Sequence, residues 1–161
     1  MITKRYLYIS IFFALLVFSG CWYSFTDKPY PQIKSVGVIP FENQTPEYDV
    51  ASIATDYLTR KISSGSAYKL SSPDVADGVI SGKIISYTRK VNTYDESENP
   101  IDYIIKVKAS LTFVQRVDNK KLWETTFEGY ATFPVDGDEL GAKNDAIKLL
   151  VENIYNKLKG G

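Results

Sequence analysis

The chain has 161 residues, of which 44% are hydrophobic, and this length and composition are typical of one globular domain. Its 19 Lys and Arg balance 19 Asp and Glu, so the sequence carries no strongly basic footprint for a duplex nucleic acid. The absence of His and the single Cys exclude Ser/His/Asp and Cys/His catalysis, His- or Cys-based metal sites and a disulfide framework.

Residues 1–20 have the pattern of a signal peptide. Lys4 and Arg5 precede an uncharged apolar run at residues 6–18. A helix that spans a bilayer needs about 20 apolar residues, so this run is too short for a permanent anchor. We therefore expect it to be removed from the mature protein.

The segment Phe18-Ser19-Gly20-Cys21 resembles the lipobox of bacterial lipoproteins, in which the cysteine is acylated and becomes the first residue. We predict that Cys21 is the lipid attachment site, that residues 21–32 form a lipidated tether and that residues 33–161 form a single domain. One acyl chain binds a bilayer only marginally, so a durable anchor needs several chains. Trp22 stands where Asp would mean retention in the inner membrane, which points to the periplasmic face of the outer membrane.

The first half of the domain predicts a strand and a helix. The β-branched run Ile33–Phe41 predicts a strand that ends at Pro40 and the polar loop after it. Residues 48–64 predict a helix that ends at Gly65, because their apolar residues recur at spacings of three and four. Residues 68–70 predict a brief edge strand.

The second half predicts three consecutive long strands and a second helix. The expected strands are residues 79–94, 103–113 and 122–133, and the acidic stretch at residues 95–100 predicts a hairpin loop between the first two. Residues 140–158 again show helical spacing, with Asp138 placed to cap the helix.

The first of these strands changes the phase of its alternation at Ile84-Ile85, which a bulge near Gly82 would explain. The element order is therefore strand, helix, three strands, helix. Two amphipathic helices can cover only one face of a four-stranded sheet. We predict an α+β two-layer sandwich with a mostly antiparallel sheet.

The uncovered sheet face carries Lys106 and Lys108, which alternate with the dry residues of the strand 103–113. Arg89 and Lys90 on the preceding strand extend this surface if the bulge leaves them on the same face. Lysines on an exposed strand are ordinary and also prevent edge-to-edge aggregation. The alternative is a binding surface for a ligand with anionic head groups and acyl tails, with Lys106, Lys108, Arg89 and Lys90 as the candidate contacts.

Four segments together resemble the lipopolysaccharide-assembly lipoprotein family, LptE. They occur in the family's order and span essentially the whole mature chain. They are Cys21 to Phe25, Ile33 to Asn43, Ala76 to Tyr87 and Leu122 to Val135. Members of the family often have Gly after the cysteine, and Trp22 departs from that pattern.

The resemblance implies a function that composition and spacing do not. Members of this family lie at the inner leaflet of the outer membrane, fill the lumen of the β-barrel partner LptD as plug and assembly factor, and bind lipopolysaccharide. It implies no enzymatic reaction and no cofactor. The aromatic content, 14% of the chain, suits a rigid filling of a wet lumen.

Two alternatives remain open. The stretch Val38 to Asn43 also resembles the opening of outer-membrane lipoproteins that activate peptidoglycan synthases or build a secretion pore, although those folds alternate strands and helices more regularly. A periplasmic glycosidase would need two convergent carboxylates, whereas the predicted elements place most acidic residues in loops or on solvated helix faces.

Overall fold

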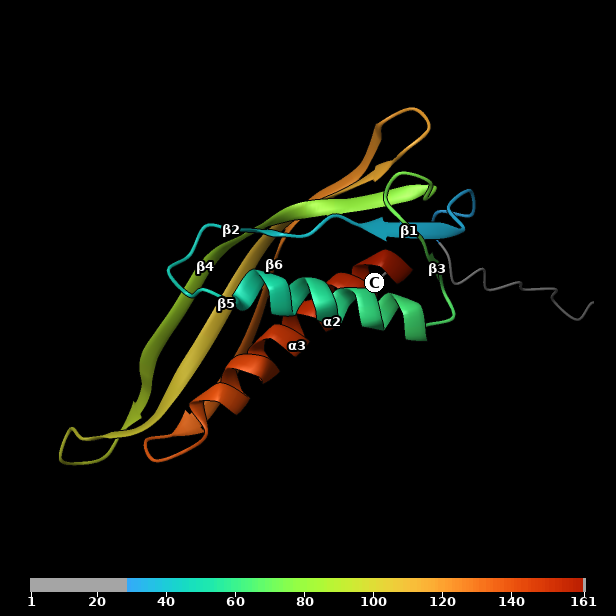
Figure 1. The fold of residues 1–161 in the computed structure, drawn as a ribbon. Coiled ribbons are helices and arrows are strands. Elements are labelled where there is room, and N and C mark those ends of the chain that lie inside the picture. Colours follow the sequence, from blue (N-terminus) through green and yellow to red (C-terminus); the bar gives the residue numbers. More distant parts are fainter. Residues whose placement is uncertain (1–28, 161) are drawn as a thin grey trace, which may run out of the picture.

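The computed structural model describes residues 29–160, so the predicted signal peptide and Cys21 lie outside the described residues. Two helices lie side by side on one face of a mixed sheet, which confirms the predicted α+β class (Figure 1). The elements are β1 (Ser35–Val38), β2 (Glu42–Asn43), α2 (Val50–Ser64), β3 (Lys69–Leu70), β4 (Gly78–Tyr94), β5 (Pro100–Gln115), β6 (Lys120–Pro134) and α3 (Glu139–Lys159).

The sheet has six strands where the predicted sandwich had four, because the brief edge strand expected at residues 68–70 joins the sheet as β3 and the first strand is divided in two. Their order is β3-β1-β4-β5-β6, and β2 also pairs with β4. The predicted strand at residues 33–41 is divided into β1 and β2 around Pro40, which has no N–H to give to a ladder. The chain stays beside β4 across the break, because Ile39 N–H donates to Ile80 O and Gln44 N–H donates to Ile84 O, each at 2.9 Å.

The strands β4, β5 and β6 form a long antiparallel meander. The short strands pair in parallel: β1 lies between β3 and β4, and β2 pairs with β4. The register of β4 against β5 shifts between Ile84 and Ser86, so Ile85 is the extra residue of a bulge. The predicted bulge is thus present, three residues beyond Gly82. Past the helices, the β4–β5 hairpin continues as an arm (lower left in Figure 1).

The core lies between the helices and the covered face of the sheet. One parity of β5 is buried there, and the next strand contributes Trp123 and Phe127. Asp138 caps α3 as predicted, since its carboxylate accepts a hydrogen bond from Gly141 N at 2.8 Å. Within residues 29–160, no helix is both long and apolar enough to cross a membrane.

The contact between α3 and β6 depends on Gly129. A Cβ at this position would lie 2.1 Å from the carbonyl oxygen of Ala146 and 2.4 Å from the backbone nitrogen of Leu150. These are backbone atoms of α3 and cannot rotate away. Gly129 therefore lets the helix rest directly on the strand.

Gly129→Ala should push α3 away from β6 and lower the free energy of unfolding by about 1–3 kcal/mol, the usual cost of overpacking. Urea denaturation followed by circular dichroism measures this loss. Thr132→Ala, at an exposed position of the same strand, is the control and should change stability by less than about 0.5 kcal/mol. Equal midpoints for the two variants would contradict the close approach at Gly129.

Candidate functional site

The three candidate lysines lie together on the uncovered face of the sheet. Lys106 lies opposite Thr88 of β4, and Lys108 lies opposite Ser86. Lys90 lies opposite Ile104. Directly opposed residues of neighbouring strands share a face, and the residues between these lysines on β5 are buried against the helices. The sequence prediction for these three positions is therefore matched by the register.

Arg89 lies on the other face. It pairs with the buried Ile105, and its guanidinium lies 3.8 Å from the ring centroid of Tyr103. Its Nε also donates to the Glu139 carboxylate at 3.0 Å. The bulge at Ile85 is the reason, because one extra residue exchanges the faces of every position after it. Arg89 consequently contacts Tyr103 and Glu139 at the base of the arm and does not share a face with the three lysines.

Three cations of the uncovered face have no carboxylate partner among the described residues, namely Lys83, Lys90 and Lys106. Lys108 differs, since its ammonium lies 2.9 Å from the Glu128 carboxylate. The hydrogen bond from Lys108 holds the pKa of Glu128 below its ordinary value. The free positive charge of this face is therefore concentrated on β4 and on Lys106.

A shallow pocket of about 320 Å³ opens on the same face. Lys83 contributes a cation, Ser110 and Thr112 contribute hydroxyls, and Ile39 contributes an exposed apolar side chain. The remaining lining residues are Pro40, Glu42, Ser81, Gly82 and Glu124. Because two carboxylates accompany the single cation, the pocket itself carries no net positive charge, and an anionic head group would have to contact the lysines outside it.

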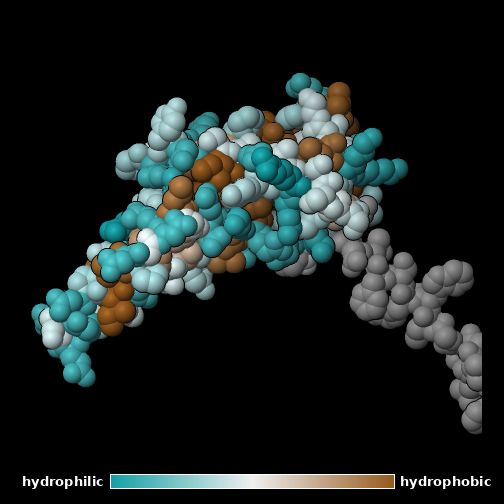
Figure 2. Space-filling view, turned by 60° about the horizontal axis from the view of Figure 1, so that its bottom comes forward, coloured by the Kyte–Doolittle hydropathy of each residue, from teal (hydrophilic) through white to brown (hydrophobic). Residues whose placement is uncertain are grey.

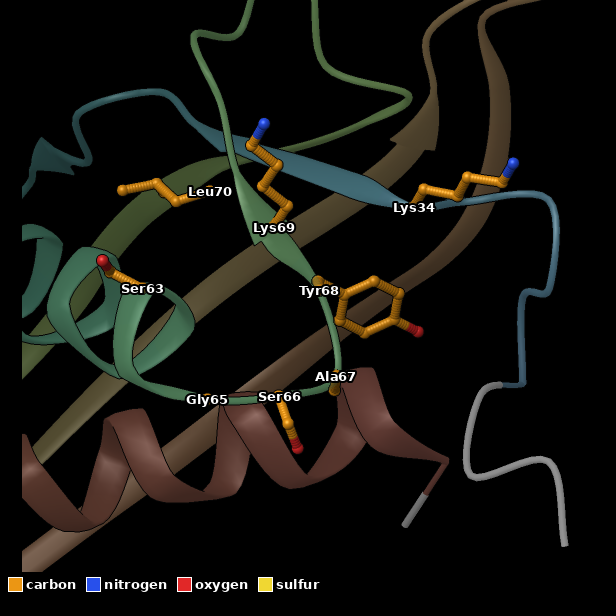
Figure 3. Close-up of a pocket in the computed structure, with 8 residues that line it drawn as sticks. All are labelled: Lys34, Ser63, Gly65, Ser66, Ala67, Tyr68, Lys69 and Leu70. Carbon is orange, nitrogen blue, oxygen red and sulfur yellow. The ribbon is translucent and has the colours of Figure 1, made fainter.

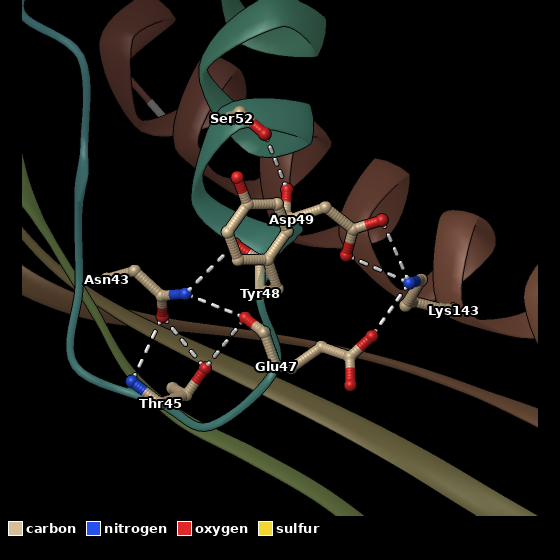
Figure 4. Close-up of polar contacts among 7 residues, drawn as sticks. All are labelled: Asn43, Thr45, Glu47, Tyr48, Asp49, Ser52 and Lys143. Carbon is tan, nitrogen blue, oxygen red and sulfur yellow. Dashed lines mark hydrogen bonds and ion pairs between the residues drawn. The ribbon is translucent and has the colours of Figure 1, made fainter.

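A second polar cluster joins the two helices (Figure 4). Lys143 of α3 is only 8% exposed, and its ammonium donates to Glu47 Oε1 at 2.7 Å and to Asp49 Oδ1 at 2.9 Å. Asn43 fixes the same loop, because its side-chain amide donates to Glu47 O at 2.7 Å. The sequence patterns did not predict this cluster. The available signal was the spacing, since Lys143 stands three and four residues before the buried Ala146 and Ile147.

The protonation of Lys143 follows from these contacts. Burial alone would lower the pKa of its ammonium, but the hydrogen bonds to Glu47 and Asp49 raise this pKa above the ordinary value of 10.5. Lys143 is therefore charged at neutral pH. The arrangement links the loop before α2 to the first turns of α3.

No group of three or more Cys, Asp or Glu residues within the described range 29–160 is arranged to hold a metal ion. Cys21 lies outside that range.

A family model described as LptE, lipopolysaccharide-assembly, matches residues 33–158. The chain belongs to the LptE family. The match covers the whole sandwich, from the residues before β1 to the last turn of α3. Membership confirms the family that the sequence resembles and supports a cell-envelope lipoprotein of the LptE type with a part in lipopolysaccharide assembly.

Solved structures with a similar fold come from several bacteria. The hypothetical protein CT253 from Chlamydia trachomatis has a TM-score of 0.59 at 12% identity, covering 80% of this chain and 96% of its own. PelC from Paraburkholderia phytofirmans, a dodecamer, has a TM-score of 0.55 at 15% identity, covering 78% and 89%.

Uncharacterized lipoprotein B from Nitrosomonas europaea has a TM-score of 0.53 at 16% identity, covering 79% of this chain and 83% of its own. At these identities the three likenesses show the shared fold alone. No curated protein matches the chain.

Lys143→Met should lower the free energy of unfolding by about 1–3 kcal/mol, between the cost for an exposed pair and that for a fully buried one, because Glu47 and Asp49 are partly exposed. Since the pKa of Lys143 is raised in the folded state, the loss of stability should be full at every pH below 10.5 and should shrink as the pH rises from 10.5 through the folded pKa.

Chemical denaturation at pH 7 and at pH 9 measures the loss of unfolding free energy at each pH, and the two losses should be equal. Lys148→Met is the control, because its partner Asp145 is exposed, and it should cost less than about 0.5 kcal/mol. Equal costs for the two variants would show that the Lys143 cluster adds nothing to stability.

Proposed function

We propose that this chain is an outer-membrane lipoprotein that is held at the periplasmic face by acyl chains on Cys21, plugs and helps to assemble the β-barrel LptD, and binds lipopolysaccharide. The observation that carries the proposal is the LptE family match over residues 33–158. The predicted signal peptide at residues 1–20 also supports it, because this segment ends in two small residues directly before the single cysteine of the chain.

Several surface features support a role inside a wet lumen. Tyr48, Tyr94 and Tyr130 are more than half exposed. Tyrosine gives a rigid contact area with a polar tip, which suits interfaces that retain water. The arm at the end of β4 and β5 also carries the exposed Ile101, so apolar area is available far from the core.

The uncovered face supports the binding of lipopolysaccharide. The phosphates of lipopolysaccharide would contact Lys90 and Lys106, which have no carboxylate partner among the residues that the structure describes. Ile104 lies opposite Lys90 and two residues before Lys106 on the same face, so it can contact an acyl chain. No step of this proposal requires the chain to catalyse a reaction, and we infer that it is not an enzyme.

Purification of the tagged chain from detergent-solubilised envelopes of its native host tests the anchor and the partner together. We expect a mature protein that begins at Cys21 and carries acyl mass, together with a large outer-membrane barrel. Cys21→Ser is the matched control and should leave uncleaved or mislocalised precursor. Recovery of a peptidoglycan synthase, or of a ring of this chain alone, without a barrel would reject the proposal.

Lys106→Glu combined with Lys108→Glu tests the binding face. The double variant should bind lipopolysaccharide about tenfold more weakly at low salt and lose most of the salt dependence of binding, because two cations become anions. Fluorescence titration at two salt concentrations measures this change.

The control is Arg60→Glu combined with Lys148→Glu, which makes the same change of charge on the helices. Thermal unfolding midpoints should stay close to wild type in both variants, since all four side chains are exposed. Equal affinity of wild type and the Lys106/Lys108 variant would remove this face as the binding site.

A further inference from the structure

The two ends of the domain carry opposite charge. At the end of the arm, the turn between β4 and β5 holds Asp95, Glu96 and Glu98, and the turn between β6 and α3 holds Asp136 and Asp138. Neither turn contains a Lys or an Arg. Figure 2 shows that the arm ends in a hydrophilic tip.

The opposite end is basic. Lys34 precedes β1 and Lys69 lies in β3, while Lys157 and Lys159 lie in the last turn of α3. None of the four is paired with a carboxylate among the described residues. Two neighbouring segments at this end, residues 71–77 and residues 116–121, the latter including the first two residues of β6, contain three acidic and three basic residues and therefore add no net charge.

Contacts between distant segments bring these lysines to one place. Lys69 N–H donates to Lys34 O at 3.0 Å, and the hydroxyl of the neighbouring Tyr68 donates to Leu158 O at 2.9 Å. Figure 3 shows Lys34 and Lys69 on adjacent segments, with α3 running below them in this view. They line a hollow of about 590 Å³ together with Ser63 and residues 65–68 and 70.

The described chain begins at this same end. A Cβ added to Gly160 would lie 3.4 Å from Pro29, so the start of the described chain meets the end of α3. Seven residues, 22–28, separate Pro29 from Cys21. Even fully extended, they span at most about 28 Å. The 17 residues of β4 cover about 55 Å, so the basic end stays closer to the anchor than the acidic tip can.

We propose that the basic end, defined by Lys34, Lys69, Lys157 and Lys159, docks on the anionic phospholipid headgroups of the leaflet that holds the acyl chains of Cys21. This inference rests on the anchor proposed above. The tether alone would let the domain lie on its side. Attraction at one end and repulsion of the acidic tip then fix the direction of the long axis, with the arm pointing away from that headgroup surface.

The length of the tether suits this role. Electrostatic attraction between exposed charges fades over about 8 Å at physiological ionic strength, so cations contribute only if they are held near the bilayer. Acyl chains at Cys21 supply that proximity, and the lysines add the second signal that lipid-anchored proteins commonly use. Residues 21–28 themselves contain one acidic and one basic residue, so the charge comes from the domain.

The test uses the mature lipidated chain in vesicles that contain no lipopolysaccharide. A fluorophore is placed at the basic end with Ser66→Cys or at the tip with Ser97→Cys, and energy transfer to a labelled headgroup is measured. Transfer from position 66 should be at least twofold stronger in vesicles of phosphatidylethanolamine and phosphatidylglycerol at 3:1 than in phosphatidylcholine. Half-molar salt should remove the difference, and transfer from position 97 should be no stronger in the anionic vesicles than in phosphatidylcholine.

Lys69→Glu combined with Lys159→Glu should abolish the difference at position 66. Arg60→Glu combined with Lys148→Glu changes the net charge equally at exposed positions of the helices and should preserve the difference. Equal transfer in both kinds of vesicle, the same loss in both double variants or a closer approach of position 97 would each overturn the proposal.

Failure of the anchor is distinguished by mass spectrometry. If the mature chain carries no acyl mass, the same chain is floated with the anionic vesicles. Binding that disappears in the Lys69/Lys159 variant would then uphold the basic end as a membrane surface without the anchor. No flotation of the wild-type chain would overturn it.

Discussion

One extra residue in the longest strand, Ile85, decides which side chains of β4 reach the helices. Before it, Ile80 and Ile84 point into the core, and after it Tyr87 and Arg89 take their place. Without the bulge, Lys90 would be directed at α3 and would have to lose its hydration. The bulge thus allows a single strand of 17 residues to serve the core along its first half and the base of the arm along its second.

Two surfaces of the domain carry positive charge, namely the uncovered face of the sheet and the basic end. The uncovered face sets its lysines among hydroxyl and apolar groups, including Ile104 and the exposed Ile85. At the basic end, Lys34 and Lys69 line a hollow together with Ser63, Ser66 and their neighbours. An amphiphile with acyl chains gains contact area only on the first surface, whereas a plane of headgroups needs charge alone. The two surfaces therefore suit different anionic partners and need not compete.

Periodicity predicted most of the fold because burial on one side leaves a direct trace in the sequence. The alternation in β5 and the spacing in α2 and α3 are of this kind, and the bulge was visible as a phase change at Ile84-Ile85. The division of the first strand at Pro40 and the pairing of β2 with β4 were not predicted, since a strand of two residues is too short to show a period.

The candidate site was predictable only where one strand defined it. Lys106 and Lys108 share a parity within β5, so their common face follows from that strand alone. The face on which Arg89 lies depends on where the extra residue enters β4. The sequence does not fix that position, so it allows Arg89 on either face of the sheet. Lys143 shows the converse limit. A charge on an apolar stripe needs partners, but Glu47 lies 96 residues away, and only the packing of the loop before α2 against α3 brings the two together.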